Sequence, residues 1–195
     1  MSNKIVLASG NQKKIQELQD ILAPLNYEIV PQGSLNIDDA VEDGLSFVEN
    51  AIKKARHAAK LSGLPALADD SGIEVDAING QPGIYSARFS GDQATDQKNN
   101  EKLLSLLKDT PEADRTARFQ CVIVYMRHAE DPTPIICQGS WEGRILKAPQ
   151  GDSGFGYDPL FYVSEHQCSA AELSKEQKHA LSHRGKALAL LKAAL

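Results

Sequence analysis

The chain has 195 residues, and its 21 Lys and Arg against 26 Asp and Glu give a formal net charge of −5. Its 42% hydrophobic and 24% charged residues exclude a disordered or low-complexity chain. The acidic balance argues against a nucleic-acid polymer or an anionic membrane as partner, because both require a basic surface. We predict a single domain over residues 1–195.

The cysteine content and the length of the apolar runs indicate the cellular compartment of the protein. Cys121, Cys137 and Cys168 are odd in number and form no C-x-x-C pair, which disfavours a disulfide framework or a cysteine zinc site. The apolar run Ile5–Ala8 is too short for a signal peptide, whose core needs about 7–15 residues. No run reaches the roughly 20 residues of a membrane span. We predict a cytoplasmic protein without a membrane partner.

The first elements in chain order alternate between strand and helix. Lys4–Ala8 has the pattern of a short buried strand, which Ser9-Gly10-Asn11 interrupts. Apolar residues at helical spacing predict a helix over Lys13–Leu22. Tyr27–Val30 is predicted as a second strand, and the acidic segment Gln32–Gly44 as a loop or irregular strand.

A strongly marked helix follows. Ser46-Phe47-Val48-Glu49 has the S-x-x-E form of a capping box, and Gly63 supplies a stop. Ala66–Ala68 is then predicted as a short buried strand that ends in Asp69-Asp70-Ser71-Gly72. Ile73–Ala77 alternates apolar and acidic residues, which predicts a separate strand with one wet face.

The second half of the chain continues the mixed pattern. The predicted elements are a loop over Asn79–Gly91, a helix from about Thr95, an antiparallel strand pair over Ala117–Met126 and Ile135–Trp141, a Gly-rich loop over Gln150–Pro159, a strand over Leu160–Val163, and one or two helices over Ser174–Leu195. Because helices do not separate the strands evenly, we predict an α/β fold with a mixed sheet.

Three groups of residues could carry chemistry, and the first is Ser9-Gly10-Asn11-Gln12-Lys13-Lys14. It joins a strand to a helix, whose first N–H groups lack partners and attract anions. Two lysines would strengthen such a site. A simple turn with solvated lysines is the alternative.

The second segment is Asp69-Asp70-Ser71-Gly72. Adjacent carboxylates beside a buried strand are costly unless cations or donors offset them. Successive strand side chains point to opposite faces, so one carboxylate would face a ligand and the other the support side. Magnesium (Mg²⁺) prefers such oxygens, and Glu42 or Asp43 could supply a second carboxylate. Capping of the following turn is the alternative.

The third group lies in the last quarter of the chain. Gly154-Phe155-Gly156-Tyr157-Asp158-Pro159 combines glycines that let a ligand approach with aromatic rings that stack on a base. Lys178, His183 and Arg184 could turn inward if a break at Ser182 interrupts the terminal helix. A structural turn and a solvated helix face are the alternatives.

Taken in order, the motifs closely resemble those of the non-canonical purine nucleoside triphosphate pyrophosphatases, the inosine and xanthosine triphosphatases. The matching segments are Ser9-Gly10-Asn11 with Lys14, Phe47-Val48-Glu49-Asn50-Ala51 with Lys54-Ala55, Ala68-Asp69-Asp70-Ser71-Gly72, Pro82-Gly83-Ile84-Tyr85-Ser86-Ala87-Arg88, Gly154-Phe155-Gly156-Tyr157-Asp158-Pro159, and Ser182-His183-Arg184. The resemblance covers nearly the whole chain.

This resemblance implies an elongated mixed α/β sheet with flanking helices and two lobes around a central active-site cleft. It also implies a homodimer and a magnesium-dependent cleavage between the α and β phosphates. The products would be a nucleoside monophosphate and pyrophosphate, which removes inosine, deoxyinosine and xanthosine triphosphates from the nucleotide pool.

Carried over by position, the resemblance also implies residue roles. Asp70 would bind the metal and accept the proton of the attacking water, with Glu42 as second metal ligand and Asp43 as its competitor. Lys54 would add charge near the phosphates. The implied substrate-binding residues are Ser9, Gly10, Asn11, Gln12, Lys13 and Lys14 for the triphosphate, Ser71, and Phe155, Gly156, Tyr157, Asp158, Lys178, His183 and Arg184 for the purine.

One position departs from the family pattern, since Ser9 stands where a threonine is usual and preserves the hydroxyl. Two other functions compete with this one. A septum-inhibitor-type pyrophosphatase would favour pyrimidine or modified nucleotides. A nucleotide sensor would bind the same ligands without hydrolysing them.

Overall fold

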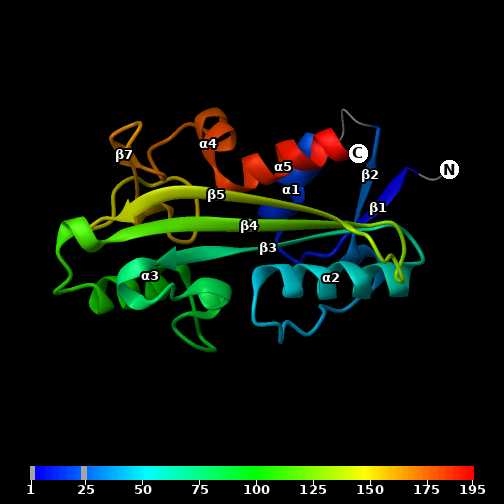
Figure 1. Ribbon diagram of the computed structural model, residues 1–195, viewed down its shortest axis with the longest axis horizontal. Coiled ribbons are helices and arrows are strands. Elements are labelled where there is room, and N and C mark those ends of the chain that lie inside the picture. The colour runs from blue at the N-terminus through cyan, green and yellow to red at the C-terminus, as the bar shows by residue number, and fades with distance from the viewer. Residues whose placement is uncertain (1–2, 23–25) are drawn as a thin grey trace. The chain divides into compact units, whose positions relative to one another are not determined.

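The computed structural model describes residues 3–22 and 26–195, without the side chains of Gln12, Lys13, Glu17, Asp20 and Ile21. Within these residues seven strands form one sheet in the order β2-β1-β3-β4-β5-β6-β7 (Figure 1). The strands are β1 (Lys4–Leu7), β2 (Glu28–Pro31), β3 (Ala66–Val75), β4 (Thr116–Met126), β5 (Ile135–Ile145), β6 (Phe161–Val163) and β7 (Cys168–Ser169). The α-helices are α1 (Gln12–Leu22), α2 (Phe47–Ser62), α3 (Asp96–Leu106), α4 (Lys175–Leu181) and α5 (His183–Ala194).

The sheet is mixed, as predicted. β1 pairs in parallel with both β2 and β3, whereas β5, β6 and β7 pair antiparallel. β4 and β5 are neighbours and run in opposite directions, which confirms the predicted antiparallel pair (Figure 1). β7 was not predicted from the sequence, because two residues carry no measurable alternation.

The chain divides into two compact units. The first holds Met1–Asp70, Val122–Gln138 and Ala187–Leu195, and the second holds Ser71–Cys121 and Gly139–Lys186. The long strands β3, β4 and β5 contribute residues to both units. That residues 1–195 act as a single domain stays a prediction.

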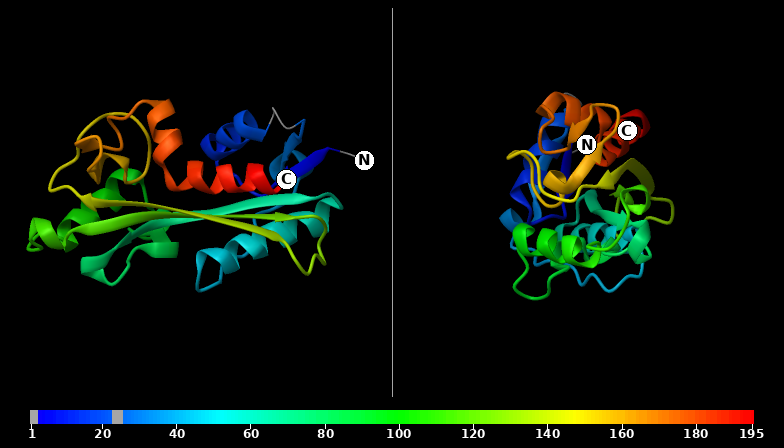
Figure 2. Two further views of the ribbon diagram at one scale, coloured as in Figure 1. Left: turned by 45° about the horizontal axis from the view of Figure 1, so that its top comes forward. Right: turned by 90° about the vertical axis from the view of Figure 1, so that its left-hand side faces the viewer.

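In the first unit, α1 and α2 lie on opposite faces of the sheet (Figure 2). Ala51, Ala55, Ala58 and Ala59 of α2 are buried against β1, β3 and β4. These small side chains let the helix lie close to the strands. The predicted helix start is confirmed, since the Ser46 side chain accepts a hydrogen bond from the Glu49 backbone N–H. The helix therefore has a fixed start and a fixed face.

Helix α2 ends where the sequence predicts. Gly63 has a φ of 68°, a left-handed conformation that glycine adopts without steric cost, and its N–H donates to the Ala59 carbonyl. Because both ends of α2 are fixed, the position of Lys54, in its second turn, relative to the sheet is also fixed.

In the second unit, α3 and α4 lie on opposite faces of the sheet (Figures 1 and 2). Its core contains the stacked and tilted rings of Phe119, Trp141 and Phe161, together with Leu103 of α3. Within the described residues, no helix combines the length and apolar character that crossing a bilayer requires.

The terminal helices are separated at Ser182, as the sequence suggested. A full capping box at Ser174 begins α4, and Ser182 takes an extended backbone with φ −68° and ψ 156° before α5 begins. This break turns the first residues of α5 away from the axis of α4.

Candidate active site

The acidic pair Asp69-Asp70 lies within a continuous strand, and this corrects the sequence-based expectation. A strand end after Ala68 and a new strand from Ile73 were expected, but β3 runs unbroken from Ala66 to Val75. The turn-capping alternative for these aspartates is therefore wrong. Both carboxylates are buried, with Asp69 1% and Asp70 7% exposed. The strand can carry them because two lysines neutralise their charge.

Asp69 faces helix α1. Its Oδ2 lies 2.8 Å from Lys14 Nζ, and the Lys14 side chain is 17% exposed. A buried carboxylate needs such a partner, because an isolated charge in the interior is strongly disfavoured. The pair fixes the Lys14 ammonium beside the first turn of α1.

Asp70 faces helix α2, on the opposite side of the strand. Its Oδ1 lies 3.3 Å from Lys54 Nζ, and the same ammonium lies 3.5 Å from Glu42 Oε1. One cation is therefore shared by two carboxylates. The predicted alternation of Asp69 and Asp70 across the strand is confirmed, since α1 and α2 cover opposite faces.

Charge and burial compete at this cluster. Burial raises the pKa of Asp70, the Lys54 charge lowers it and the Glu42 charge raises it, and the net direction is upward. Burial lowers the pKa of Lys54, but the charges of Asp70, Asp69 and Glu42 outweigh it and the net direction is also upward. Lys54 thus stays protonated, while Asp70 is a stronger base than an exposed aspartate.

Glu42 and Asp43 have different ion-pair partners. Asp43 is mostly exposed and forms an ion pair with Lys53. Glu42 instead points toward Lys54 and Asp70. Of the two candidate second carboxylates, the geometry favours Glu42.

The donor set suits a hard divalent ion. Glu42 and Asp70 converge on one ammonium, so a position between them already accommodates positive charge. In the part of the chain that the structure describes, no three His, Cys, Asp or Glu side chains gather closely enough to hold a metal on their own. Magnesium does not need three, because it retains water and shares substrate phosphates.

The segment from Ser9 to Lys14 caps helix α1. The Asn11 N–H donates to Ser9 Oγ at 3.2 Å, and the Lys14 N–H donates to Asn11 Oδ1 at 3.3 Å. Gly10 is exposed. The backbone of Gln12 and Lys13 lies in α1, but their side chains lie outside the described residues. Two N–H groups at the start of α1 thus bond to side chains of the segment itself.

A pocket of about 480 Å³ borders this segment. Ser9 and Gly10 line one side, and Gln32, Asp38 and Asp39 belong to the other side. Asp39 accepts a hydrogen bond from the Gln32 amide.

The second unit holds the residues expected to bind a base. In the loop from Gly154 to Asp158, the Phe155 N–H donates to Asp158 Oδ2 at 2.8 Å. Gly154 has a φ of 82°, and a Cβ there would meet Asp158 Oδ2 at 2.2 Å, so only glycine fits. Lys178 forms an ion pair with Asp158, and its Nζ lies 5.0 Å from the Phe155 ring centroid.

His183 and Arg184 are buried, so the solvated-helix alternative is wrong for both. They are 8% and 4% exposed. The His183 ring stacks on Phe119 at a centroid distance of 4.8 Å and an interplanar angle of 13°. Arg184 Nη2 donates to Ser71 Oγ at 3.1 Å, which brings two predicted site residues together.

Tyr157 has a structural contact that the sequence did not reveal. Its ring belongs to the core of the second unit, and its hydroxyl donates to the Ser86 carbonyl at 2.7 Å. The side chain is therefore turned away from solvent. Substrate contact by Tyr157 stays a prediction, and its phenol is a support for the loop.

Two residues of α3 that were not singled out also contact this loop. Asp96 and Asn100 bind the backbone of Gly156 through their side chains. The available signal was the dipeptide Asn99-Asn100 in a helix, where asparagine is unfavourable unless its side chain has a specific partner.

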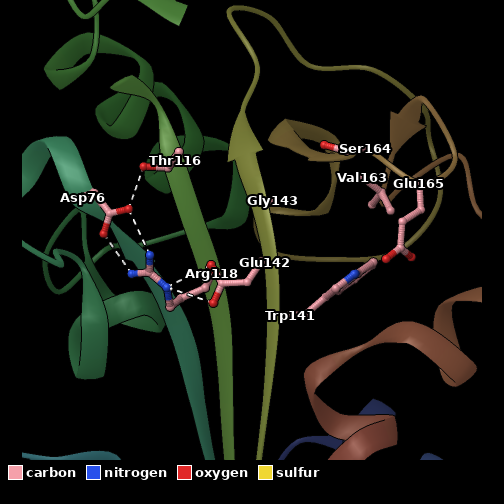
Figure 3. Close-up of a pocket in the computed structure, with 9 residues that line it drawn as sticks. All are labelled: Asp76, Thr116, Arg118, Trp141, Glu142, Gly143, Val163, Ser164 and Glu165. Carbon is pink, nitrogen blue, oxygen red and sulfur yellow. Dashed lines mark hydrogen bonds and ion pairs between the residues drawn. The ribbon is translucent and has the colours of Figure 1, made fainter. Parts of the chain in front are cut away.

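A different pocket of about 460 Å³ in the second unit contains none of the predicted site residues (Figure 3). Arg118 lines it, and its guanidinium donates to Asp76 at 2.8 and 2.9 Å and to Glu142 at 3.1 Å. The hydrogen bonds that Arg118 donates to Asp76 raise the pKa of Arg118. Because two carboxylates neutralise it, this cation is not placed to bind phosphate.

The predicted site residues thus fall into two clusters. One in the first unit holds Lys14, Glu42, Lys54, Asp69 and Asp70, and one in the second unit holds Phe155, Asp158 and Lys178. The chain belongs to the Ham1 family, whose model matches residues 5–194. The match spans both compact units and every predicted site residue.

Relatives show how close the likeness is. A protein of Shigella flexneri named dITP/XTP pyrophosphatase is 60% identical over 192 residues, with 98% of each chain covered. The structure of a HAM1 protein from Coxiella burnetii has a TM-score of 0.94 and 50% identity, covering 98% of this chain and 97% of that one. A Mycobacterium abscessus structure named nucleoside-triphosphatase / dITP/XTP pyrophosphatase has a TM-score of 0.79 and 41% identity, covering 96% and 97%.

Proposed function

We propose that this protein hydrolyses non-canonical purine nucleoside triphosphates, namely inosine, deoxyinosine and xanthosine triphosphate, to the nucleoside monophosphate and pyrophosphate. The observation that carries the proposal is the convergence of Glu42 and Asp70 on one cation, on the strand that also carries Ser71. The names of its close relatives support the substrate class.

Asp70 and Glu42 would hold a magnesium ion. When bound, such an ion polarises the phosphate oxygens and neutralises part of their charge. The two carboxylates fit it because they already surround the Lys54 ammonium. Asp70 would accept a proton from the attacking water, and burial, by raising its pKa, makes it better suited to that task.

The cations of the first unit would stabilise the leaving group. Pyrophosphate gains negative charge as the bond between the α and β phosphates breaks, and fixed positive groups reduce that cost. Lys14 is held in place by Asp69, so it needs little rearrangement to meet an anion. The N-terminus of α1, with Ser9 through Lys14, would bind the triphosphate alongside it.

The second unit would select the base. Phe155 would stack on the purine, while Asp158 and Lys178 would lie at its edge. A 6-oxo group accepts a hydrogen bond, whereas the amino group of adenine donates one. A pocket with donors at this position leaves them unpaired when adenine binds, which disfavours adenine strongly. His183 and Arg184 would complete the pocket, with Arg184 holding Ser71.

The proposal extends to the enzyme's setting. We infer a single catalytic domain that works as a cytoplasmic homodimer on free nucleotides. The net charge of −5 supports free nucleotides over nucleic-acid polymers as substrates.

A panel of nucleoside triphosphates tests the proposal. Pyrophosphate release is measured with magnesium for inosine, xanthosine, deoxyinosine, guanosine, adenosine, thymidine and uridine triphosphates, and with excess chelator as control. We expect turnover of the first three to exceed the others at least about tenfold and to vanish with chelator. Faster turnover of a pyrimidine would favour the septum-inhibitor-type function. Binding without release of pyrophosphate would favour the sensor.

A further inference from the structure

Helix α3 binds both backbone polar groups of Gly156, in the loop from Gly154 to Asp158. The Gly156 N–H donates to Asp96 Oδ2 at 2.7 Å, and the Gly156 carbonyl accepts from Asn100 Nδ2 at 2.9 Å. Gly156 has a φ of 62°, so its backbone is in the left-handed region. The two bonds thus fix the two peptide groups on either side of a glycine, the residue whose own backbone is the most permissive.

Asp96 and Asn100 form a rigid pair. They are four residues apart and so lie on one face of α3. The Thr95 side chain caps the helix by accepting from the Lys98 N–H at 3.2 Å. Leu103, one turn further, is fully buried in the core of the second unit. The backbone that carries both side chains is therefore anchored at the start of the helix and in the core.

The next residue of the loop is fixed from the same direction. The Tyr157 hydroxyl donates to the Ser86 carbonyl at 2.7 Å. Asn99, between Asp96 and Asn100 in sequence, donates to the Ser86 and Ala87 carbonyls and accepts from Ser90. Three residues of one helix turn thus support the loop, two directly and one through Ser86.

The residues that would meet the base flank this supported peptide. Phe155 precedes Gly156, and its N–H is bound by Asp158. Lys178 contacts both Asp158 and the Phe155 ring. Because the Gly156 N–H belongs to the peptide group that joins Phe155 to Gly156, its bond to Asp96 fixes the backbone from which the Phe155 ring projects.

We propose that Asp96 and Asn100 are positioning residues for purine selection: they hold Gly156 so that Phe155 and Asp158 meet the base in a fixed geometry. This inference rests on the proposed function. Neither side chain touches the substrate. Both act through the loop, and they act on base recognition and not on the cleavage of the phosphate bond.

Isosteric substitutions separate this role from general stability. Asn100→Asp keeps the size of the side chain but places an acceptor against the Gly156 carbonyl. Asp96→Ala removes the acceptor of the Gly156 N–H, whereas Asp96→Asn retains an oxygen that accepts it. Gln97→Ala is the matched control, since Gln97 lies exposed on the same turn and bonds only to Glu101 among the bonds described.

The experiment compares KM and kcat for inosine and guanosine triphosphates across these variants. We expect Asn100→Asp and Asp96→Ala to raise KM for inosine triphosphate about tenfold, with kcat within about twofold. The preference for inosine over guanosine triphosphate should fall by a similar factor. Asp96→Asn should keep KM within about threefold of wild type, and Gln97→Ala should change neither constant.

A purely structural role gives a different result. Partial unfolding lowers the active fraction, which reduces kcat while KM and base preference stay unchanged, and that pattern would overturn the inference. Calorimetric binding of inosine monophosphate supplies a readout that needs no turnover. If wild type binds this nucleotide without hydrolysing the triphosphate, the proposed function fails, and weaker binding by Asn100→Asp still supports the positioning role.

Discussion

Replacing Asp70 by Asn should abolish activity without reducing stability. The substitution keeps the shape of the side chain and removes its charge and its capacity to accept a proton. A positioned general base contributes about 10²–10⁴-fold to a rate, so we expect kcat to fall at least about a hundredfold, equivalent to about 3 kcal/mol in the activation barrier.

The stability expectation follows from the surroundings of Asp70. Its attraction to the Lys54 ammonium at 3.3 Å is worth about 5 kcal/mol at an effective dielectric constant of 20. Burial and the charge of Glu42 oppose this attraction, and the pKa of Asp70 is raised on balance. A raised pKa means that the folded protein favours the neutral form of Asp70. Protonation of Asp70 therefore stabilises the folded state at low pH, and this stabilisation is lost as pH rises through the folded pKa. At pH 7, a permanently neutral Asn is therefore at least as stable as the ionised carboxylate.

The assay pairs pyrophosphate release with thermal unfolding at pH 7. We expect Asp70→Asn to be inactive, to bind inosine triphosphate, and to unfold at or above the midpoint temperature of wild type. Asp69→Asn is the contrasting control, since it removes the buried carboxylate that pairs with the half-buried Lys14 and should lower the midpoint. An Asp70→Asn variant that keeps more than a tenth of the wild-type kcat, or that unfolds markedly earlier, would refute the reasoning.

Three further outcomes concern the framework of the site. Gly185→Ala should lower the unfolding midpoint by about 4–8 °C in a thermal scan, because a Cβ there would lie 1.7 Å from the His179 carbonyl oxygen. Arg115→Met should cost about 3–5 kcal/mol in denaturant unfolding, since its buried guanidinium donates to three backbone carbonyls at 2.7–2.8 Å. The Arg127 guanidinium lowers the pKa of Asp131 below its ordinary 3.8. The free energy of unfolding of wild type should thus exceed that of Asp131→Asn by its largest amount at pH 7, and the difference should decrease below about pH 4 in denaturant unfolding curves.

Local signals predicted the helices well. Ser46 and Gly63 delimit α2, and Ser174 begins α4, as the capping patterns require. Such signals succeed because a cap is formed by residues three or four apart, whose interaction depends little on the rest of the chain. The break at Ser182 was one of two possibilities that the sequence left open, one helix or two, and the structure has two helices.

The course of β3 was not predictable in this way. A pair of aspartates resembles the end of a buried strand, and the sequence gives no local reason to continue it. The compensating charges come from Lys14 on α1 and Lys54 on α2, which are distant in sequence. Only the fold brings these cations to Asp69 and Asp70, so the strand boundary depended on tertiary contacts.

The support of the base loop was missed for a related reason. Asp96 and Asn100 lie more than fifty positions before Gly156, and their sequence context is an ordinary polar helix. The motif Gly154–Pro159 could be recognised because its own residues suit a ligand. The residues that hold it in place have no motif, since any donor or acceptor on the right face of α3 could serve.

The alternation of β3 explains how two neighbouring aspartates serve different tasks. Asp69 pairs with Lys14 on one face, and Asp70 shares the Lys54 ammonium with Glu42 on the other. A shift of the strand by one residue would exchange these faces. The parallel pairing of Val6 with Ala66 and of Leu7 with Leu67 fixes the register immediately before the pair. The buried apolar residues of β1 and β3 therefore do more than stabilise the core, because they determine which carboxylate faces Glu42.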